Sequence, residues 1–445
     1  MAGRHTAGAA GLHETGYGTG GAAAGTGRGL PAESRGTAMK IDYEAVIQGG
    51  GMVGLALALT LARAGLPVAV LEAHTPRRWR REDPVDQRVS AISVASERYL
   101  GRLGAWADIR RARACPFHGI HAWDGEGGGA IHFDAHRYGE PHLGHIVENR
   151  LIQTTLWQHL SRHDNVRLMV PGSVEGWDAE PEGLRVRLND GGECTTRLLV
   201  GADGARSRLR ELAGIGHSVR PYGQHGVVGT VWPEHHHGGI ARQRFLPTGP
   251  LALLPLADGS CSIVWSCPEA QATELLELPE ARFREQLTQA SEAVLGPINA
   301  CGPRAAFPLR RSHARRYIDR RLALVGDAAH TIHPLAGQGV NLGFMDAATL
   351  AEEMLAAHER GRDPGGQAVL QRFQRRRLGA NHLMQTGMDA FHWLFANDLP
   401  PLVVLRSLGL SLTDRLAPAK SLFMARAMGL SGELPALARP HPQTG

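Results

Sequence analysis

The apolar positions of this chain fall into short continuous runs separated by longer Ala- and Leu-rich stretches. Residues 43–48 and 67–71 are predicted to be buried strands, with a helix at residues 55–64 between them. Two further apolar runs, at residues 198–201 and 322–325, lead into glycine-containing turns. Continuous apolar strands separated by helices are typical of a parallel sheet that is covered on both faces, so we expect a Rossmann-type core.

The middle of the chain follows a different pattern. In residues 117–133 and 226–265, apolar and polar positions alternate between turn residues, which predicts antiparallel strands. A sheet of this kind would form a substrate-binding layer over the core. Phe245, Pro250 and Leu253 are candidates to line its pocket, although core packing is the commoner role of such residues.

A glycine-rich turn, G-x-G-x-x-G, follows the first predicted strand. Gly49 permits the tight turn, Gly51 leaves space for a pyrophosphate, and Gly54 lets the helix approach the strand. The turn also contains Met52 and Val53, and the helix start supplies free N–H groups for phosphates. The turn therefore predicts a site for a dinucleotide.

An acidic residue closes the second predicted strand. Glu72 can accept hydrogen bonds from ribose hydroxyls and would repel a 2′-phosphate. A strand, a glycine-rich turn, a helix, a second strand and an acid in this register strengthen the prediction of a dinucleotide site. The pattern alone does not separate FAD from NAD.

Composition adds an N-terminal tail to this picture. Residues 1–39 are rich in Gly, Ala and Thr and cannot bury a core, so we expect them to be disordered. No apolar stretch reaches the ~18 residues that a transmembrane helix needs. The five cysteines are widely spaced and contain no CxxC, which fits a cytoplasmic protein and argues against a disulfide framework.

The net charge of +5 is too small an excess to indicate nucleic-acid binding. The densest basic run comprises Arg77, Arg78, Arg80 and Arg81. We interpret it as a solvated loop, with contact to an anionic partner or membrane surface as the alternative. Residues 383–430 form a predicted amphipathic helical region, which either packs on the core or docks on a membrane or partner.

Two later segments point to a particular family. Residues 198–208 read LLVGADGARSR and residues 322–330 read LALVGDAAH, and they resemble the DG and GD motifs of group A flavoprotein hydroxylases. The resemblance implies FAD as the cofactor, with Asp327 on its ribitol chain, Asp203 in contact with FAD and NAD(P)H, and Arg88 near the flavin nucleotide. Each aspartate follows a predicted parallel strand, where open α/β sheets bind ligands.

The segment after the GD motif is a longer match. Residues 333–348 read HPLAGQGVNLGFMDAA and resemble ubiquinone-biosynthesis hydroxylases. Residues 344–346 and 426–430 look nearest to the 2-polyprenylphenol 6-hydroxylase branch of that group. Gly337, Gly339, Val340 and Asn341 would open a helix whose N–H groups face the flavin's pyrimidine edge. We expect the helix itself to start at about Phe344.

The resemblance implies a reaction as well as a cofactor. NAD(P)H is the expected electron donor, molecular oxygen the co-substrate and a flavin C4a-hydroperoxide the hydroxylating species. The substrate would be a lipophilic polyprenylphenol, reached by peripheral contact with the inner membrane, and other ubiquinone-biosynthesis proteins are expected partners. No catalytic side chain is assigned. A hydroxylase of another ring position, a flavin-dependent reductase and a non-catalytic flavin-bound scaffold remain alternatives.

No metal site is predicted. Residues 234–238 contain three consecutive histidines, but no cysteine or carboxylate set completes a site, so we expect an exposed loop. His330 and His333 lie within the flavin motif and are therefore not interpreted as metal ligands.

The predicted fold class is mixed α/β (α+β), a Rossmann-type FAD-binding domain interleaved with an antiparallel substrate domain and followed by a helical C-terminus. After the tail, the expected boundaries are 40–115, 145–217 and 306–360 for the FAD-binding domain, 116–144 and 218–305 for the substrate domain, and 361–445 for the C-terminal helical region.

Overall fold

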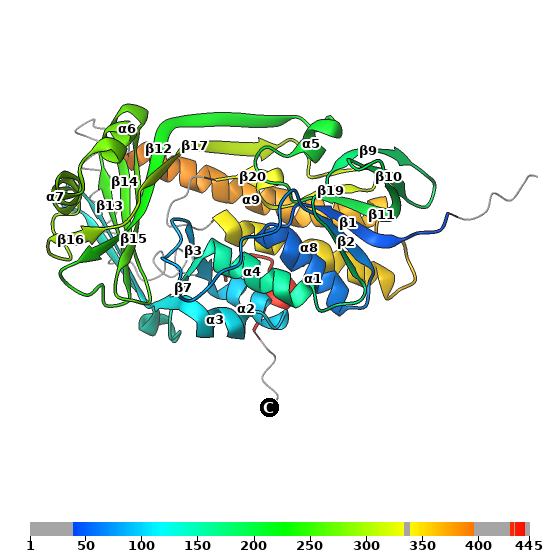
Figure 1. Ribbon diagram of the computed structural model, residues 1–445, viewed down its shortest axis with the longest axis horizontal. Coiled ribbons are helices and arrows are strands. Elements are labelled where there is room, and N and C mark those ends of the chain that lie inside the picture. Colours follow the sequence, from blue (N-terminus) through cyan, green and yellow to red (C-terminus); the bar gives the residue numbers. More distant parts are fainter. Residues whose placement is uncertain (1–38, 333–338, 396–427, 431, 441–445) are drawn as a thin grey trace, which may run out of the picture. The chain divides into compact units, whose positions relative to one another are not determined.

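The computed structural model describes residues 39–332, 339–395, 428–430 and 432–440. The predicted tail, Gly337 and most of the C-terminal amphipathic region lie outside the described residues. Contacts group residues 39–445 as one unit, whose described part contains two large sheets and one small sheet (Figure 1).

The first large sheet forms the Rossmann-type core. Its central strand, β1, pairs in parallel with β11 on one side and β2 on the other. The strand order is β18-β19-β11-β1-β2-β8, and a β9–β10 hairpin extends β11. The strands are β1 (Tyr43–Gln48), β2 (Val68–Leu71), β8 (Val166–Met169), β9 (Val174–Ala179), β10 (Leu184–Leu188), β11 (Glu193–Gly201), β18 (Ile318–Asp319) and β19 (Leu322–Leu324).

The second large sheet is mostly antiparallel, as predicted, except that β13 pairs in parallel with β5. Its order is β20-β17-β12-β15-β14-β13-β5-β6, with β16 beside β12. The strands are β5 (Gly119–Asp124), β6 (Ala130–Asp134), β12 (His217–Pro233), β13 (Ile240–Leu246), β14 (Gly249–Pro255), β15 (Cys261–Pro268), β16 (Ile298–Cys301), β17 (Ala305–Ala314) and β20 (His330–Thr331). A small third sheet contains β3 (Val89–Ser93), β7 (Gly144–Glu148) and β4 (Ala114–Phe117).

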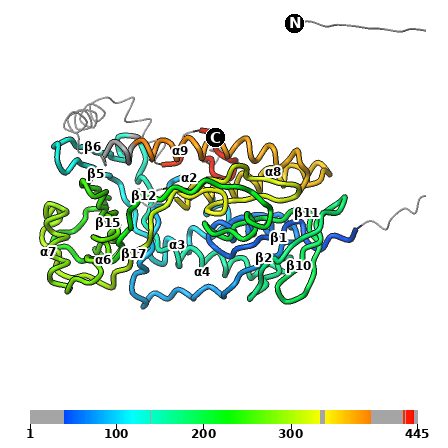
Figure 2. Tube along the Cα trace, turned by 90° about the horizontal axis from the view of Figure 1, so that it is seen from above, coloured from blue at the N-terminus to red at the C-terminus, as the bar shows by residue number. Residues whose placement is uncertain are grey.

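Helices cover the core sheet and connect it to the second sheet. They are α1 (Met52–Arg63), α2 (Val94–Arg102), α3 (Trp106–Arg113), α4 (Asn149–Leu160), α5 (Arg208–Leu212), α6 (Glu269–Glu277), α7 (Glu280–Ala290), α8 (Gly339–His358) and α9 (Gln367–Phe395), with 3-10 turns η1 (Ala135–Tyr138), η2 (Gly326–Ala328) and η4 (Ala436–Ala438). Figures 1 and 2 both show α8 beside α9, and Figure 1 shows the long strands β12 and β17 running towards α5. None of the described helices is long and apolar enough to cross a membrane.

The sequence of α1 explains its central position. Residues 54–62 of this helix are all buried, because small and apolar side chains on every face let it pack against β1, α4 and α8 together. Gly343 of α8 permits close packing here, since a Cβ at this position would lie 2.6 Å from Val53. The sequence predicted a helix from about Phe344, but α8 begins earlier, at Gly339. Gly343 therefore lies within the helix, where it packs against α1 and does not open a turn.

The domain boundaries stay a prediction. The first of the two large sheets draws its strands from residues 43–201 and 318–324, and the second from residues 119–134, 217–314 and 330–331. β17 starts at Ala305 and β20 ends at Thr331. The chain thus crosses between the sheets several times, and this interleaving brings the ends of β1, β11 and β19 towards β12 and β17.

Candidate functional site

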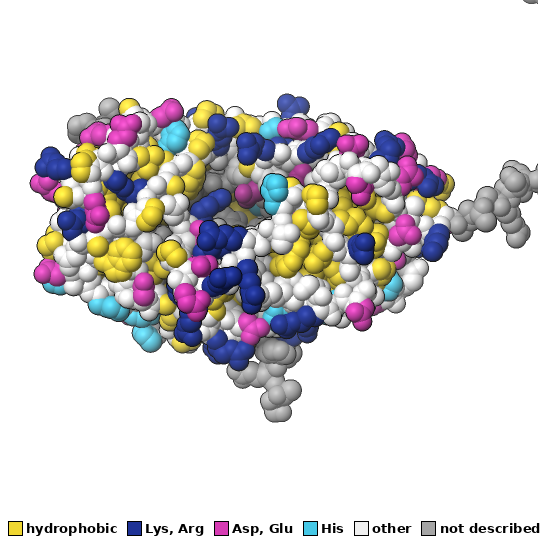
Figure 3. All heavy atoms as spheres, viewed as in Figure 1, with side chains coloured by type: hydrophobic (Ala, Val, Ile, Leu, Met, Phe, Trp, Pro, Cys, Tyr) yellow, Lys and Arg dark blue, Asp and Glu magenta, His cyan; other side chains and the backbone are white. Residues whose placement is uncertain are grey.

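A cavity of about 930 Å³ lies where the two large sheets approach each other. This volume falls within the roughly 300–1,000 Å³ typical of small-molecule and cofactor sites. Figure 3 shows a hollow on this face with Lys and Arg side chains around it. One wall comes from the start of α1, the loop after β11, η2 and the start of α8, and the other from β12, β15 and β17.

The glycine-rich turn forms the end of the cavity nearest β1. Gly49 has a φ of +112°, and a Cβ there would lie 2.3 Å from the carbonyl oxygen of Ala202. A Cβ on Gly54 would lie 2.1 Å from the Gly49 oxygen. Both glycines are thus required by the fold. Gly51 differs, because nothing lies within 4 Å of its Cβ position and the residue lines the cavity.

Met52 and Val53 line the cavity beside Gly51. The first N–H groups of a helix have no partners within that helix, and they carry the positive end of the helix dipole. An open cradle in front of free N–H groups suits a phosphate. Gly51, Met52 and Val53 therefore lie as a pyrophosphate-binding turn requires, whereas Gly49 and Gly54 shape the turn from behind.

Glu72 is bonded within the protein. Its Oε2 accepts a hydrogen bond from the Gly50 N–H at 2.6 Å, and its Oε1 accepts one from the Ala73 N–H at 2.7 Å. Gln153 supports the same turn by donating from Nε2 to the Gly50 carbonyl oxygen at 2.7 Å. Glu72 is not among the residues that line the cavity, so its contact with a ribose stays a prediction.

The GD motif lies on the floor of the cavity. Asp327 lies in η2, directly after β19, and its side chain is accessible from the cavity. The surrounding protein nevertheless excludes enough water to raise the pKa of Asp327 above the usual aspartate value, and the nearby charges of His330 and Arg88 offset this only in part. Arg88 lines the same cavity, with its guanidinium 5.6 Å from the centre of the Phe307 ring, and its contact with a flavin nucleotide stays a prediction.

Asp203 occupies a different position from the one predicted. Gly204 and Arg206 line the cavity, but Asp203 does not. Its Oδ2 accepts a hydrogen bond from the Leu209 N–H at 3.1 Å, so the side chain supports the start of α5. Its Oδ1 is buried and has no partner. Asp203 therefore shapes the loop that carries Gly204 and Arg206.

The start of α8 agrees with the prediction in part. Gly339 and Val340 line the cavity, and Gly337 lies outside the described residues. Asn341 does not line the cavity, because its amide is bonded to β3. Its Oδ1 accepts from the Ser93 N–H at 3.0 Å, and its Nδ2 donates to the Ala91 carbonyl oxygen at 2.8 Å. Asn341 thus holds α8 against the small sheet.

Several lining residues were not predicted. Asn149, Arg150 and Gln153 come from the first turns of α4, directly after β7. The apolar wall consists of residues of the second sheet, namely Val228, Val264 and Phe307. Phe245, Pro250 and Leu253 are buried elsewhere in that sheet and do not line the cavity. The alternation of apolar and polar residues predicted that these three residues lie in strands, but it did not predict which face of the sheet lines the cavity.

The charge of the cavity is positive. Five arginines line it, with Asp86 and Asp327 as the acidic lining residues. Arg150 is paired with Asp83 at 3.3 Å. The described lining contains no His, Cys, Lys or Tyr. The site therefore suits an anionic ligand, and we assign no catalytic side chain. The arginines are Arg77, Arg88, Arg150, Arg206 and Arg310.

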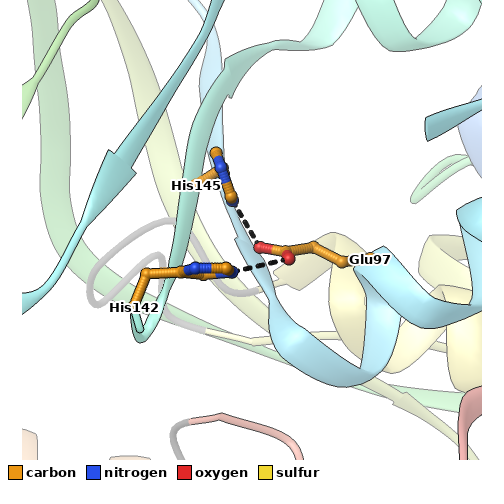
Figure 4. Close-up of side chains that lie close together, drawn as sticks. All are labelled: Glu97, His142 and His145. Carbon is orange, nitrogen blue, oxygen red and sulfur yellow. Dashed lines mark hydrogen bonds and ion pairs between the residues drawn. The ribbon is translucent and has the colours of Figure 1, made fainter. Parts of the chain in front are cut away.

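A buried carboxylate between two histidines lies outside this cavity (Figure 4). Glu97 of α2 accepts from His145 Nδ1 at 2.6 Å through Oε1 and from His142 Nε2 at 2.9 Å through Oε2. The three side chains form a group that could hold a metal ion, which the sequence did not predict. Their separations are hydrogen-bond lengths, and the carboxylate bridges the two rings, so the group is satisfied as a hydrogen-bonded triad.

The triad shifts the pKa values of its members. Burial alone would raise the pKa of Glu97, but the hydrogen bonds from His142 and His145 bring it below the usual value. The hydrogen bond to Glu97 raises the pKa of His142. Among the consecutive histidines, His235 and His236 are exposed, but His237 is buried and bonded through Nε2 to the Leu256 carbonyl oxygen at 2.9 Å. The predicted exposed loop is therefore wrong for His237.

Comparison with known proteins identifies FAD as the cofactor of this family. The family model described as FAD binding domain matches residues 42–386, which include the glycine-rich turn, Asp203 and Asp327. The chain belongs to this FAD binding domain family and is an FAD-dependent monooxygenase. Within the family it groups with the ubiquinone-biosynthesis hydroxylases.

Three relatives show this grouping. The 3-demethoxyubiquinol 3-hydroxylase of Escherichia coli is 40% identical, covering 87% of this chain and 98% of its own length. Ubiquinone hydroxylase UbiL of Rhodospirillum rubrum is 39% identical, covering 90% and 93%. The mitochondrial ubiquinone biosynthesis monooxygenase COQ6 of Danio rerio is 35% identical, covering 86% and 89%.

Solved structures confirm the predicted fold class. The p-nitrophenol 4-monooxygenase PnpA from Pseudomonas putida matches with a TM-score of 0.73 at 20% identity, covering 89% of this chain and 100% of that chain. HpxO from Klebsiella pneumoniae, complexed with FAD and uric acid, matches with a TM-score of 0.67 at 19% identity, covering 87% and 97%. At these identities the likeness concerns the fold alone.

The residues of the cavity fit FAD. The open cradle at Gly51 and the free N–H groups of α1 would hold its pyrophosphate, and Asp327 and Arg88 lie where its ribitol and flavin nucleotide would extend. Bound FAD supplies the redox and oxygen-activating chemistry of the monooxygenase. The chain contributes binding and orientation, and the apolar strand residues opposite limit the access of water.

Proposed function

We propose that this enzyme hydroxylates the aromatic ring of a polyprenylated phenol in ubiquinone biosynthesis, at position 6 of 2-polyprenylphenol. The observation that carries the proposal is a cavity with two unlike walls. Polar and cationic residues of the core side face Val228, Val264 and Phe307 of the second sheet. A flavin held by the first wall would present its ring to an aromatic substrate packed on the second.

A second ring position has specific support. The Escherichia coli relative, at 40% identity, is named a 3-demethoxyubiquinol 3-hydroxylase. The predicted position instead rests on residues 344–346 and 426–430, and residues 426 and 427 lie outside the described part of the chain. Hydroxylation of a later, methoxylated precursor is therefore the alternative within the same pathway.

The remaining reactants are part of the proposal. Molecular oxygen is the co-substrate, and NAD(P)H is the electron donor, bound transiently near Gly204 and Arg206. Both residues lie on the loop after β11 and line the cavity. The arginines around the cavity would attract the phosphates of such a donor.

We further propose a cytoplasmic enzyme that works at the inner face of the inner membrane with other ubiquinone-biosynthesis proteins. A polyprenylated substrate resides in lipid, so the enzyme must reach it there. The amphipathic pattern of residues 383–430 supports membrane contact, although residues 396–427 lie outside the described part of the chain.

The first test is a mass-spectrometric profile of quinones and their precursors in a strain that lacks the gene. Accumulated 2-polyprenylphenol supports hydroxylation at position 6. Accumulated methoxylated precursor moves the reaction to the later ring position. An unchanged ubiquinone pool, which persists when the remaining hydroxylase genes of the strain are also deleted, contradicts a role in this pathway and favours a reductase or a flavin-bound scaffold.

A further inference from the structure

A stripe of polar side chains runs along one face of α9. Arg377, Asn381, Gln385 and Asp389 are spaced four residues apart, so they project from the same side of the helix. The first three are almost fully buried. Gln385 donates to the carbonyl oxygens of Ser312 and Thr331, at 2.8 Å each, and Asp389 bonds Tyr222 and Arg311. The stripe thus joins α9 to β12, β17 and β20.

The other end of the stripe meets a buried carboxylate on α8. Asp346 is fully buried, and each of its oxygens accepts two hydrogen bonds. Oδ1 accepts from Arg377 Nε at 2.7 Å and from Asn381 Nδ2 at 3.0 Å. Oδ2 accepts from the Gly326 N–H at 3.1 Å and from His330 Nε2 at 2.5 Å.

The bonds to Oδ2 enclose the GD motif. Gly326 and His330 stand on either side of Asp327, so one carboxylate oxygen fixes the loop before and after the residue that faces the cofactor. Gly326 has a φ of +59°, a left-handed conformation that needs support from its surroundings. Thr331, the next residue along, lines the cavity and is fixed by Gln385 through its carbonyl oxygen.

The electrostatics show that Asp346 is charged. Burial alone would raise its pKa, but the charges of His330 and Arg377, together with the hydrogen bonds, hold the pKa well below the usual aspartate value. A buried ion pair is a weak way to stabilise a fold, since apolar residues often do as well, but it fixes geometry closely when every atom is satisfied.

We propose that Asp346 is a positioning residue for flavin binding, which transmits the placement of α9 to the GD loop and thereby sets where Asp327 meets FAD. Asp346 does not line the cavity and so acts through Gly326 and His330. The inference rests on the FAD binding that the family shares, and it is independent of the ring position that the enzyme hydroxylates.

The test is the affinity of apoprotein for FAD, measured by quenching of flavin fluorescence, in Asp346→Asn and in a matched control. The amide keeps the size of the side chain but places a donor where four donors already converge. We expect the Kd for FAD to rise about tenfold or more, which corresponds to about 1.4 kcal/mol. The control is Glu353→Gln, which weakens the pairing of α8 with Arg372 and Arg376 of α9, while Glu353 bonds none of the described residues of the GD loop. The Kd of this control for FAD should stay within about twofold of the parent value.

A second pair of variants separates positioning from folding. His330→Gln retains an N–H donor near the position of Nε2, whereas His330→Leu removes it. We expect His330→Gln to bind FAD nearly as well as the parent, with the same flavin absorption bands, and His330→Leu to bind it about tenfold more weakly. If Asp346→Asn fails to fold, this pair decides. Equal FAD affinity in His330→Gln and His330→Leu, or a parent-like Kd in Asp346→Asn, would overturn the proposal.

Discussion

At the scale of single residues, the site combines positions that shape the backbone with positions that face the cofactor. Asp327 belongs to the second kind, because it lies on the cavity floor and its side chain bonds no neighbouring element among the described residues. Asp203 and Asn341 belong to the first kind. Sequence motifs mark both kinds alike, because a family retains a residue that builds a site as firmly as one that touches the ligand.

Asp327→Ala is therefore expected to fold but to purify without yellow colour. The variant removes the side chain that we expect to contact FAD and leaves the packing of η2 to Gly326 and Ala328, which are buried. The measurements are the flavin-to-protein absorbance ratio and the thermal midpoint of the apoprotein. Asp178→Ala is the control, since Asp178 forms only a surface ion pair with Arg187, worth about 0–1 kcal/mol. Full flavin content in Asp327→Ala would refute the assigned role.

Two of the motif glycines, Gly51 and Gly54, give a second prediction at this scale. Gly51→Ala adds a methyl group to open space, so the apoprotein should keep its stability while FAD binding weakens. Gly54→Ala places the methyl group 2.1 Å from a backbone oxygen, and overpacking of this kind costs about 1–3 kcal/mol. Urea unfolding of the two apoproteins, beside an FAD titration of Gly51→Ala, distinguishes the roles. A destabilised Gly51→Ala apoprotein with normal FAD affinity would show that Gly51 is required by the fold and not by the cofactor.

At the scale of elements, hydrophobic patterning located the core strands well. Residues 43–48 form β1, whose apolar centre at residues 45–47 is buried, and residues 68–71 form β2, which is apolar and buried throughout, as expected for strands covered on both faces. The lining of the cavity was less predictable. Which face of an antiparallel strand meets the flavin depends on how the second sheet is placed on the core, and alternation along one strand does not carry that information.

The triad of Glu97, His142 and His145 joins α2 to β7 and to the segment before it, and it makes stability depend on pH. The lowered pKa of Glu97 contributes stability above the glutamate value of 4.5, which is lost as pH falls through the folded pKa. The raised pKa of His142 contributes stability below the histidine value of 6.5, which is lost as pH rises through the folded pKa. The triad should therefore stabilise most between these values.

His142→Gln tests the direction in which the contribution of His142 to stability changes with pH. The amide can still donate to Glu97 but carries no charge, so we expect a loss of about 1–2 kcal/mol on the acidic side of neutrality and almost none at alkaline pH. Urea unfolding as a function of pH measures it, with the exposed His136→Gln as the control. A loss that is the same at every pH would contradict the titration of His142.

At the scale of the whole molecule, the sequence predicted the class of fold and the two kinds of sheet, but not how they are joined. β12 and β17 run from the body of the second sheet to the region of α5, and the polar stripe of α9 bonds that sheet at one end and Asp346 of α8 at the other. These connections between elements are hydrogen bonds between residues far apart in the chain, for example those of Asp346 with Arg377 and with Gly326. Single-segment patterns do not reveal these pairings, whereas the motif for the nucleotide turn is local and was recognised.

Removal of residues 2–38 is expected to leave FAD affinity and hydroxylation unchanged. All described residues that line the cavity lie between Gly51 and Gly343. The comparison of truncated and full-length protein in the same FAD titration and hydroxylation assay checks this. A truncated protein that loses flavin or activity would assign the N-terminal segment a role that composition does not suggest.

We expect this FAD-dependent enzyme to insert one oxygen atom from molecular oxygen into the ring of a polyprenylphenol. Purified enzyme with FAD, a reduced nicotinamide and 2-polyprenylphenol should be incubated under heavy-isotope oxygen gas, and the product analysed by mass spectrometry. We expect a ring-hydroxylated product that carries one heavy oxygen atom. A product labelled only from heavy-isotope water, or flavin turnover without any hydroxylated product from either phenol or methoxylated precursor, would contradict it.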